Sequence, residues 1–102
     1  MRLVIGTSPV QVLAPNPKRT KLEIQFVPSS IESGNTGNIF LAIGHPPGTA
    51  LSKLTYDEVL NAGASVVKNK DSGDSDREVK SAIWLVSDTT SQVVMISEDI
   101  AE

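Results

Sequence analysis

The stretch Ala14-Pro-Asn-Pro-Lys-Arg-Thr-Lys-Leu-Glu-Ile-Gln-Phe26 decides the fold. Its two prolines fix φ and remove two backbone donors, so the chain here turns or runs extended. Asn16 between them suits a corner, because its short amide can bond to nearby backbone. From Lys21 to Phe26 polar and apolar residues alternate, which is the period of a strand with one wet and one buried face. The stretch therefore predicts a tight turn that leads into a half-buried strand.

Six further segments have the length and composition of strands and are separated by Pro, Gly, Asn and Ser. They are Leu3–Ile5, Val10–Leu13, Asn38–Gly44, Ala64–Lys68, Val79–Val86 and Gln92–Ser97. We expect the last two to pair as a hairpin across the turn at 87–91. About seven short strands predict a single domain, residues 1–102, folded as an all-β antiparallel sandwich or jelly-roll-like barrel.

The segments between these strands predict loops. Residues 29–37 are rich in Ser, Gly and Asn, and residues 69–76 are polar. Leu51–Asn61 fits either one helical turn after a Thr55 cap or an extended stretch that ends in a turn at 61–63. We favour irregular structure there, with at most one short helical turn in the whole chain.

The composition argues against several classes of function. The chain has no cysteine and one histidine, which excludes a disulfide and a thiolate nucleophile and makes a transition-metal site improbable. The net charge is −3, with four bases and two acids in residues 1–51 and five bases and ten acids in residues 52–102. Such a mildly acidic chain is a poor match to sequence-independent nucleic-acid binding. No apolar run approaches the roughly 20 residues of a membrane-spanning helix, so we expect a soluble protein.

No reaction centre emerges from the motifs. His45 stands in a Pro-Pro-Gly turn without a flanking catalytic motif, and we interpret it as a turn residue. Asp71-Ser-Gly-Asp-Ser-Asp76 carries three carboxylates, but its spacing differs from an established calcium loop, so a solvated loop is favoured over a cation site. Asp57 and Glu58 are adjacent and diverge, unlike a glycosidase pair. We therefore predict a protein that is not an enzyme and has no cofactor and no metal site.

Three segments are apolar on both alternating faces, namely Ile39–Ile43, Ala82–Val86 and Val93–Ile96. One face of each fits the core. In one assignment the other face includes Ile83 with Leu85, and leaving such a side chain in water forgoes roughly 1.5–3 kcal/mol. Either a loop such as 29–37 or 51–61 folds over this second face, or a neighbouring subunit covers it. Our hypothesis is a homo-oligomer or a docking surface.

Lys18, Arg19 and Lys21 form a small basic cluster beside the turn. Three charges without interleaved aromatics are weak support for nucleic-acid binding. They fit equally well a contact with the acidic half of a neighbouring copy, or a wet strand face. We predict the three basic residues, with Ile83 and Leu85, as the residues that contact a partner.

Two motifs resemble those of small β proteins encoded by tailed phages. Asn16–Gln25 is similar to the Asn-Pro-x-Arg-x-x-Leu-x-Ile-x-Asn opening of that group. Ser81–Asp88, with the return Gln92–Glu98, is similar to its closing element, an apolar strand into Ser-Asp, a turn, and a Val-rich strand that ends in Glu. Asn38–Gly44 and Asn61–Gly63 occupy the places of its strand-into-Gly segment and of its pre-strand glycine, so the resemblance covers about residues 13–98.

The resemblance implies a virion structural protein without enzymatic activity, above all a capsid decoration or cement protein. Its partners would be the major capsid protein and copies of itself, with a trimer suggested by analogy alone. It would be made in the host cytoplasm and located on the capsid surface. Gln25-Phe26 and the longer acidic loop at 71–78 depart from the pattern and leave the partner's identity open.

The alternative is a receptor- or glycan-binding module of a phage fibre or tail accessory protein. In that reading the loops at 29–37 and 45–48, with Tyr56 or Trp84, form a platform. Aromatic residues are few, and Trp84 lies in the middle of an expected strand, where core packing is favoured over a sugar contact.

Overall fold

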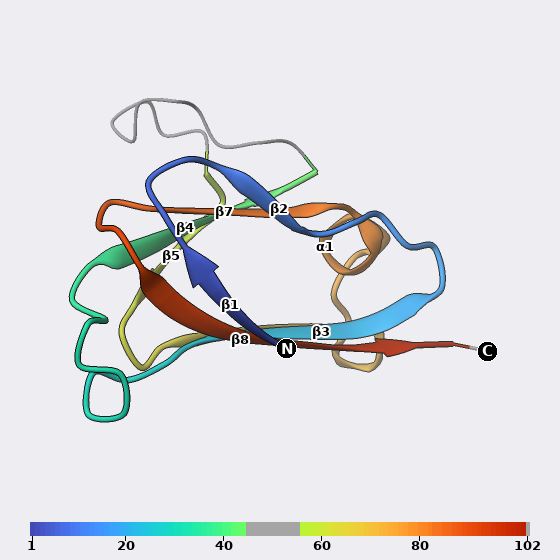
Figure 1. The fold of residues 1–102 in the computed structure, drawn as a ribbon. Coiled ribbons are helices and arrows are strands. Elements are labelled where there is room, and N and C mark those ends of the chain that lie inside the picture. Colours follow the sequence, from blue (N-terminus) through green and yellow to red (C-terminus); the bar gives the residue numbers. More distant parts are fainter. Residues whose placement is uncertain (45–55, 102) are drawn as a thin grey trace.

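The computed structural model describes residues 1–44 and 56–101 (Figure 1), and over these residues eight strands form two antiparallel sheets. Sheet A has the order β1-β8-β3-β6 and sheet B the order β2-β7-β4-β5. The strands are β1 Arg2–Ile5, β2 Val10–Leu13, β3 Arg19–Phe26, β4 Asn38–Ile43, β5 Glu58–Asn61, β6 Ser65–Asn69, β7 Ile83–Ser87 and β8 Gln92–Ile100. The predicted all-β antiparallel fold is confirmed.

The strand order is that of a jelly roll. Each strand of the first half pairs with its mirror image in the second half: β1 with β8, β2 with β7, β3 with β6, and β4 with β5. Pairing of β3 with β8 and of β4 with β7 then joins the two ribbons of each sheet. Rolling one long hairpin into two facing sheets produces this arrangement.

The expected hairpin between β7 and β8 is wrong. β7 lies in sheet B between β2 and β4, whereas β8 lies in sheet A between β1 and β3. Residues 88–91 therefore carry the chain from one sheet to the other. Both strands are central in their sheets.

The sandwich core is built from the inward positions of both sheets. Leu22, Ile24 and Phe26 of β3 are fully buried, as their alternation predicted. Across the core lie the inward residues of β4 and β7, which include Ile39, Leu41, Ile43, Ile83 and Leu85. With few aromatics available, branched aliphatic side chains fill the space between the pleated sheets.

Two helical turns occupy a region where the sequence predicted a polar loop and the start of a strand. A 3-10 turn covers Lys70–Ser72, and α1 covers Asp76–Lys80. Ser75 caps α1, because its hydroxyl accepts the Glu78 N–H at 3.2 Å, and Val79 of α1 is fully buried. The Ser-x-x-Glu spacing is a helix-start signal that the sequence analysis overlooked.

The expected segment boundaries change in two other places. The seventh strand begins at Ile83 rather than Val79, because α1 fills the preceding residues. Glu58–Asn61 is a regular edge strand, β5, within the segment for which irregular structure was favoured. Leu51–Thr55, including the proposed Thr55 cap, lies outside the described residues, as does His45.

Candidate interaction surface

The basic cluster does not form as predicted, because Arg19 is buried while Lys18 is exposed and Lys21 half-buried. Arg19 has the sequence parity of the wet face of β3. The register of β3 against β8 shifts by one residue between Arg19 and Lys21, however, so a β-bulge turns Arg19 inward. Its residue exposure is 1%, and it is therefore not available to a partner.

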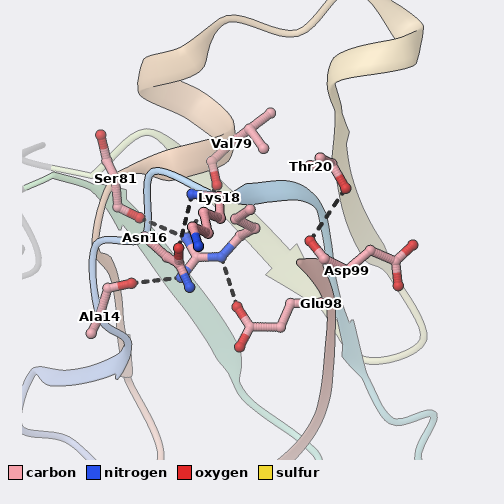
Figure 2. Close-up of polar contacts among 9 residues, drawn as sticks. Ala14, Asn16, Lys18, Thr20, Val79, Ser81, Glu98 and Asp99 are labelled. Atoms are coloured by element: carbon pink, nitrogen blue, oxygen red, sulfur yellow. Dashed lines mark hydrogen bonds and ion pairs between the residues drawn. The ribbon is translucent and has the colours of Figure 1, made fainter. Parts of the chain in front are cut away.

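The Arg19 guanidinium instead ties together three segments of the same chain. Figure 2 labels the residues that accept its hydrogen bonds, Ala14, Val79, Ser81 and Glu98. Its Nε donates to Glu98 Oε2 at 2.7 Å. Its terminal nitrogens donate to the carbonyl oxygens of Val79, Ser81 and Ala14. A guanidinium with its planar set of donors can satisfy several acceptors at once. The arrangement joins the end of α1 to β8 and to the segment before β3.

Asn16 shapes the turn that precedes Arg19. The Asn16 Oδ1 accepts the Lys18 N–H at 2.9 Å, and the Asn16 carbonyl accepts the Arg19 N–H at 3.2 Å. The Asn16 N–H donates to the Lys80 carbonyl at 2.9 Å, next to the α1 carbonyl that Arg19 binds. The Asn-Pro-x-Arg pattern in this chain is therefore a device for holding the turn against α1.

Ile83 and Leu85 are not at a surface. Both are fully buried between the sheets, as are Val94 and Ile96 of β8. The inward face of β7 pairs Leu85 with Leu41 and Ile83 with Ile43, whereas Trp84 pairs with Ala42 on the outward face. The period of two fixes that the faces alternate, but it does not say which of two apolar faces points inward.

The outer face of sheet A carries the exposed apolar residues of its strands. Val4 is 56% exposed, Val67 45% and Met95 41%. Val4 pairs with Val93 of β8. Met95, two residues further along β8, lies between Arg2 of β1 and Gln25 of β3. Val4 and Met95 are therefore diagonal neighbours on one face. We call the surface formed by Val4, Gln25, Val67 and Met95 the outer face of sheet A.

The loop at 29–37 is fixed at one margin of this face. The buried Asn35 side chain donates from Nδ2 to the carbonyls of Val27 and Val93 and accepts the Val93 N–H at its Oδ1. The amide thus replaces a strand partner where β3 ends. Val93 beside the loop is only 6% exposed, whereas Val4 and Met95 remain exposed. The loop at 29–37 was expected to cover an apolar face, but on the outer face of sheet A it covers only the margin at Val93.

The outer face of sheet B carries three of the four aromatic residues. Phe40 and Tyr56 have ring centroids 4.9 Å apart, and Trp84 lies half-buried on the same face. Trp84 is thus outside the inter-sheet core, contrary to the preferred interpretation. The loop at 29–37, however, is fastened to Val93 in sheet A, so it and Trp84 do not form one platform.

In the 71–76 segment, Asp74 and Asp76 bind other groups of the protein. Asp74 Oδ2 accepts the Asn69 N–H at 2.8 Å, and Asp76 pairs with Lys70 Nζ at 2.7 Å. The hydrogen bond and charge of Lys70, with the charge of Lys80, hold the pKa of Asp76 below its usual range. Within residues 1–44 and 56–101 no three His, Cys, Asp or Glu side chains are grouped to hold a metal ion.

Asp57 and Glu58 contact different groups. Asp57 accepts the Ile43 N–H at 2.8 Å and pairs with Arg77, whereas Glu58 binds Lys68 of the opposite sheet at 3.5 Å. Lys68 also binds Glu78 of α1 at 3.4 Å. Burial lowers the pKa of Lys68, but the two carboxylates outweigh it and raise the pKa above its usual value. These contacts close the β5–β6 side of the sandwich.

The described part of the chain has no pocket, and none of its helices could cross a bilayer. No protein-family model, curated protein or solved structure matches the chain. The arrangement of the described side chains therefore offers broad surfaces rather than a concave site, and the outer face of sheet A is the candidate for binding.

Proposed function

We propose that the protein is a virion structural protein, a capsid decoration protein that binds an assembled major capsid lattice through the outer face of sheet A. The observation that carries the proposal is the exposure of Val4, Val67 and Met95 on one open face of a jelly roll. Val4 and Met95 are diagonal neighbours on this face, whereas Val67 lies beyond β3. Contiguous exposed apolar side chains commonly mark an interaction site. The jelly roll is also a fold of viral capsid domains, a fold-level analogy.

A sheet face suits this role on physical grounds. Its strands hold the contacting side chains in a fixed pattern, so little conformational freedom is lost on binding. Each copy needs only a modest affinity when binding modules or their sites are linked on a rigid shell. A protein that binds the assembled shell and not its free subunits also stabilises the shell by mass action.

The test is co-sedimentation of the purified protein with capsids that lack decoration, together with the temperature at which those capsids break. We expect the protein to pellet with the shells and to raise that temperature. Met95→Asp should weaken pelleting about tenfold or more, because a charge would be buried against the shell. The matched control is Val59→Asp, since Val59 is exposed to a similar extent, 43% against 41%, but lies on β5 of sheet B.

Absence of pelleting by the folded wild-type protein would contradict the proposal. Equal weakening by both substitutions would instead place the contact elsewhere. Binding to an array of glycans, with no binding to shells, would favour the alternative receptor- or glycan-binding function.

A further inference from the structure

The outer edge of β1 has no strand beside it among the described strands. β1 runs from Arg2 to Ile5 and pairs with β8 along one side, where the blue arrow lies beside the red β8 in Figure 1. Sheet A has β1 at its margin, so the other side of this strand is open in the described part of the chain. The open side runs along residues 2–5 themselves and does not depend on where the chain starts.

The backbone groups that point outward from this edge can be assigned from the ladder. The Ile96 N–H donates to the Met1 carbonyl at 2.8 Å, so Met1 faces β8. Because the direction alternates along a strand, Leu3 also faces β8, whereas the N–H and carbonyl groups of Arg2 and Val4 point outward. Within residues 1–44 and 56–101 no hydrogen bond uses these four groups.

The edge strand on the other side of sheet A, β6, is protected by comparison. The outward groups of Asn69 are already bound, because Asp74 Oδ2 accepts the Asn69 N–H at 2.8 Å and the Asp74 N–H donates to the Asn69 carbonyl at 3.3 Å. The described residues supply no such cap on β1, and its Val4 is 56% exposed. Unpaired backbone groups beside an uncovered valine form the kind of edge that invites another strand.

We propose that the β1 edge pairs with the same edge of a second copy across a two-fold axis at Leu3. An edge that meets its own copy across an axis perpendicular to the sheet pairs antiparallel, as do the strand pairs within both sheets. Arg2 then lies opposite Val4 of the second copy, and the two residues exchange both N–H···O bonds. The same exchange forms by symmetry between Val4 and Arg2 of the second copy. The two A sheets become one continuous sheet.

The side chains favour this register. Leu3 is half-buried at the margin of the core, and it lies opposite Leu3 of the second copy in a pair without hydrogen bonds, where side chains come closest. On the outer face the exposed Val4 lies opposite Arg2 of the second copy, whose aliphatic stem can cover it. The Arg2 guanidinium keeps an acidic partner in its own chain, Glu32 at 3.3 Å.

The two neighbouring registers are less favourable. An axis at Arg2 would set two guanidinium groups directly opposite each other, which is destabilising. An axis at Val4 would set Arg2 opposite Gly6, which lies beyond the end of β1 and whose carbonyl already accepts the Ser87 N–H of β7 at 2.9 Å. Only Val4 would then exchange hydrogen bonds with its own copy. Of the three registers, the one about Leu3 satisfies all the outward groups of Arg2 and Val4.

This pairing goes beyond the proposed function, because it involves no shell. A pair of copies would present two outer faces of sheet A side by side, and two linked faces bind a rigid lattice more tightly than one. A two-fold pair is a dimer and not the trimer that the family resemblance suggests.

The test is sedimentation velocity of the purified chain over a range of concentrations. We expect the wild-type protein to shift from monomer to dimer as the concentration rises. Val4→Lys sets a like charge opposite Arg2 of the second copy and should weaken dimerisation about tenfold or more. Val4→Glu removes the same apolar side chain but sets an opposite charge there, so it should dimerise more tightly than Val4→Lys. Val67→Lys is the control, since Val67 is 45% exposed on β6, the other edge of the same sheet, and should leave dimerisation unchanged.

A further variant separates pairing from folding. Val4→Pro removes an N–H that points away from β8, so the monomer should keep its circular dichroism spectrum while the dimer is lost. A wild-type protein that stays monomeric throughout, that forms a trimer, or whose dimer survives Val4→Pro would overturn the inference. Equal weakening by Val4→Lys and Val4→Glu would overturn the register about Leu3. Shell binding by a monomeric protein would leave the proposed function standing, and a dimer that ignores shells would leave only the edge pairing.

Discussion

Arg19 and Glu98 are bonded across neighbouring strands, Nε to Oε2 at 2.7 Å, and the Arg19 side chain is only 2% exposed whereas that of Glu98 is 35% exposed. The pair lies at the point where a β-bulge turns Arg19 from the wet face of β3 toward α1. The two residues thus fasten the last part of β8 to the start of β3.

Replacing Arg19 by Met should destabilise the fold strongly. The change leaves Glu98 without its partner and removes the donor from three backbone carbonyls. Removing one member of a buried ion pair generally costs about 3–5 kcal/mol, and urea unfolding should show a loss near the lower end because Glu98 is partly exposed. Lys18→Met is the control and should change the free energy of unfolding by less than about 0.5 kcal/mol. Equal stability of the two variants would contradict this account of Arg19.

Asn35→Ala should loosen the loop at 29–37. The amide makes three hydrogen bonds to Val27 and Val93 backbone groups, and a buried group left unsatisfied costs about 1–3 kcal/mol. We expect a loss of about 2 kcal/mol and faster hydrogen exchange at the Val93 N–H. Thr36→Ala, an exposed change in the same loop, is the matched control. Unchanged exchange at Val93 would show that the Asn35 side chain does not hold this segment.

Gly37→Ala should also destabilise the protein, for a steric reason. A Cβ at Gly37 would overlap the side chains of Thr89 and Asp88, whereas a Cβ at Gly34 would meet nothing within 4 Å. Overpacking of this kind typically costs about 1–3 kcal/mol, so thermal unfolding of Gly37→Ala should occur at a lower temperature. Gly34→Ala should be neutral or slightly stabilising, because it only restricts the unfolded chain. A lower melting temperature for both would point to loop flexibility rather than to the overlap.

Asp88 should make the free energy of unfolding depend on pH in the acid range. Burial raises the pKa of its carboxyl, but hydrogen bonds from the Asn38 N–H, the Asn38 side chain and Thr89 outweigh it and lower the pKa below the usual 3.8. A lowered pKa gives stability that is present above 3.8 and is lost as the pH falls through the folded-state value. Asp88→Asn should thus be less stable than wild type at pH 7, with a difference that shrinks in urea unfolding near pH 2.

Asp71→Asn supplies the comparison for that experiment, because Asp71 is exposed in the 3-10 turn. The expected result is a change in the free energy of unfolding of less than about 0.5 kcal/mol. If the Asp88→Asn difference stayed constant on acidification, the hydrogen bonds to Asn38 would not be the source of the shift.

The sequence was sufficient for the fold class and for most strands, because turn residues and two-residue periodicity are local signals. Leu22, Ile24 and Phe26 were found this way, since their neighbours are polar. Ile83 and Leu85 were assigned to the wrong face because their strand is apolar on both sides, and only the second sheet decides which side is inward.

The prediction that Arg19 is exposed was wrong for a different reason. Arg19 is two residues from Lys21, so a regular strand would place both side chains on the same face. No residue type in the sequence indicates the one-residue register shift that turns Arg19 inward. The opposite case is α1, where Ser75 and Glu78 did carry a helix-start signal that was missed because the surrounding acids suggested a loop. The exposed surface could not be predicted from the sequence, because the exposure of a side chain depends on how the two sheets pack and not on one strand alone.

Lys18 and Lys21 are the members of the basic cluster that a partner can still reach, and they give the last prediction. Replacing both by Ala should weaken pelleting with shells at low salt by a few-fold, because exposed charges act mainly through screened attraction. Stability should change by less than about 0.5 kcal/mol, which separates binding from folding in a way that charge reversal at the buried Arg19 cannot.

The control for that pair keeps the change in net charge and moves it elsewhere. Ser8→Glu with Thr90→Glu also makes the chain two units more negative, at two exposed loop positions, one between β1 and β2 and one between β7 and β8. If the contact is local, the Lys18 and Lys21 variant loses binding and salt dependence while the control retains both. Equal losses would mean that only the overall charge of the protein matters, and undiminished binding by both would remove the basic residues from the proposed docking surface.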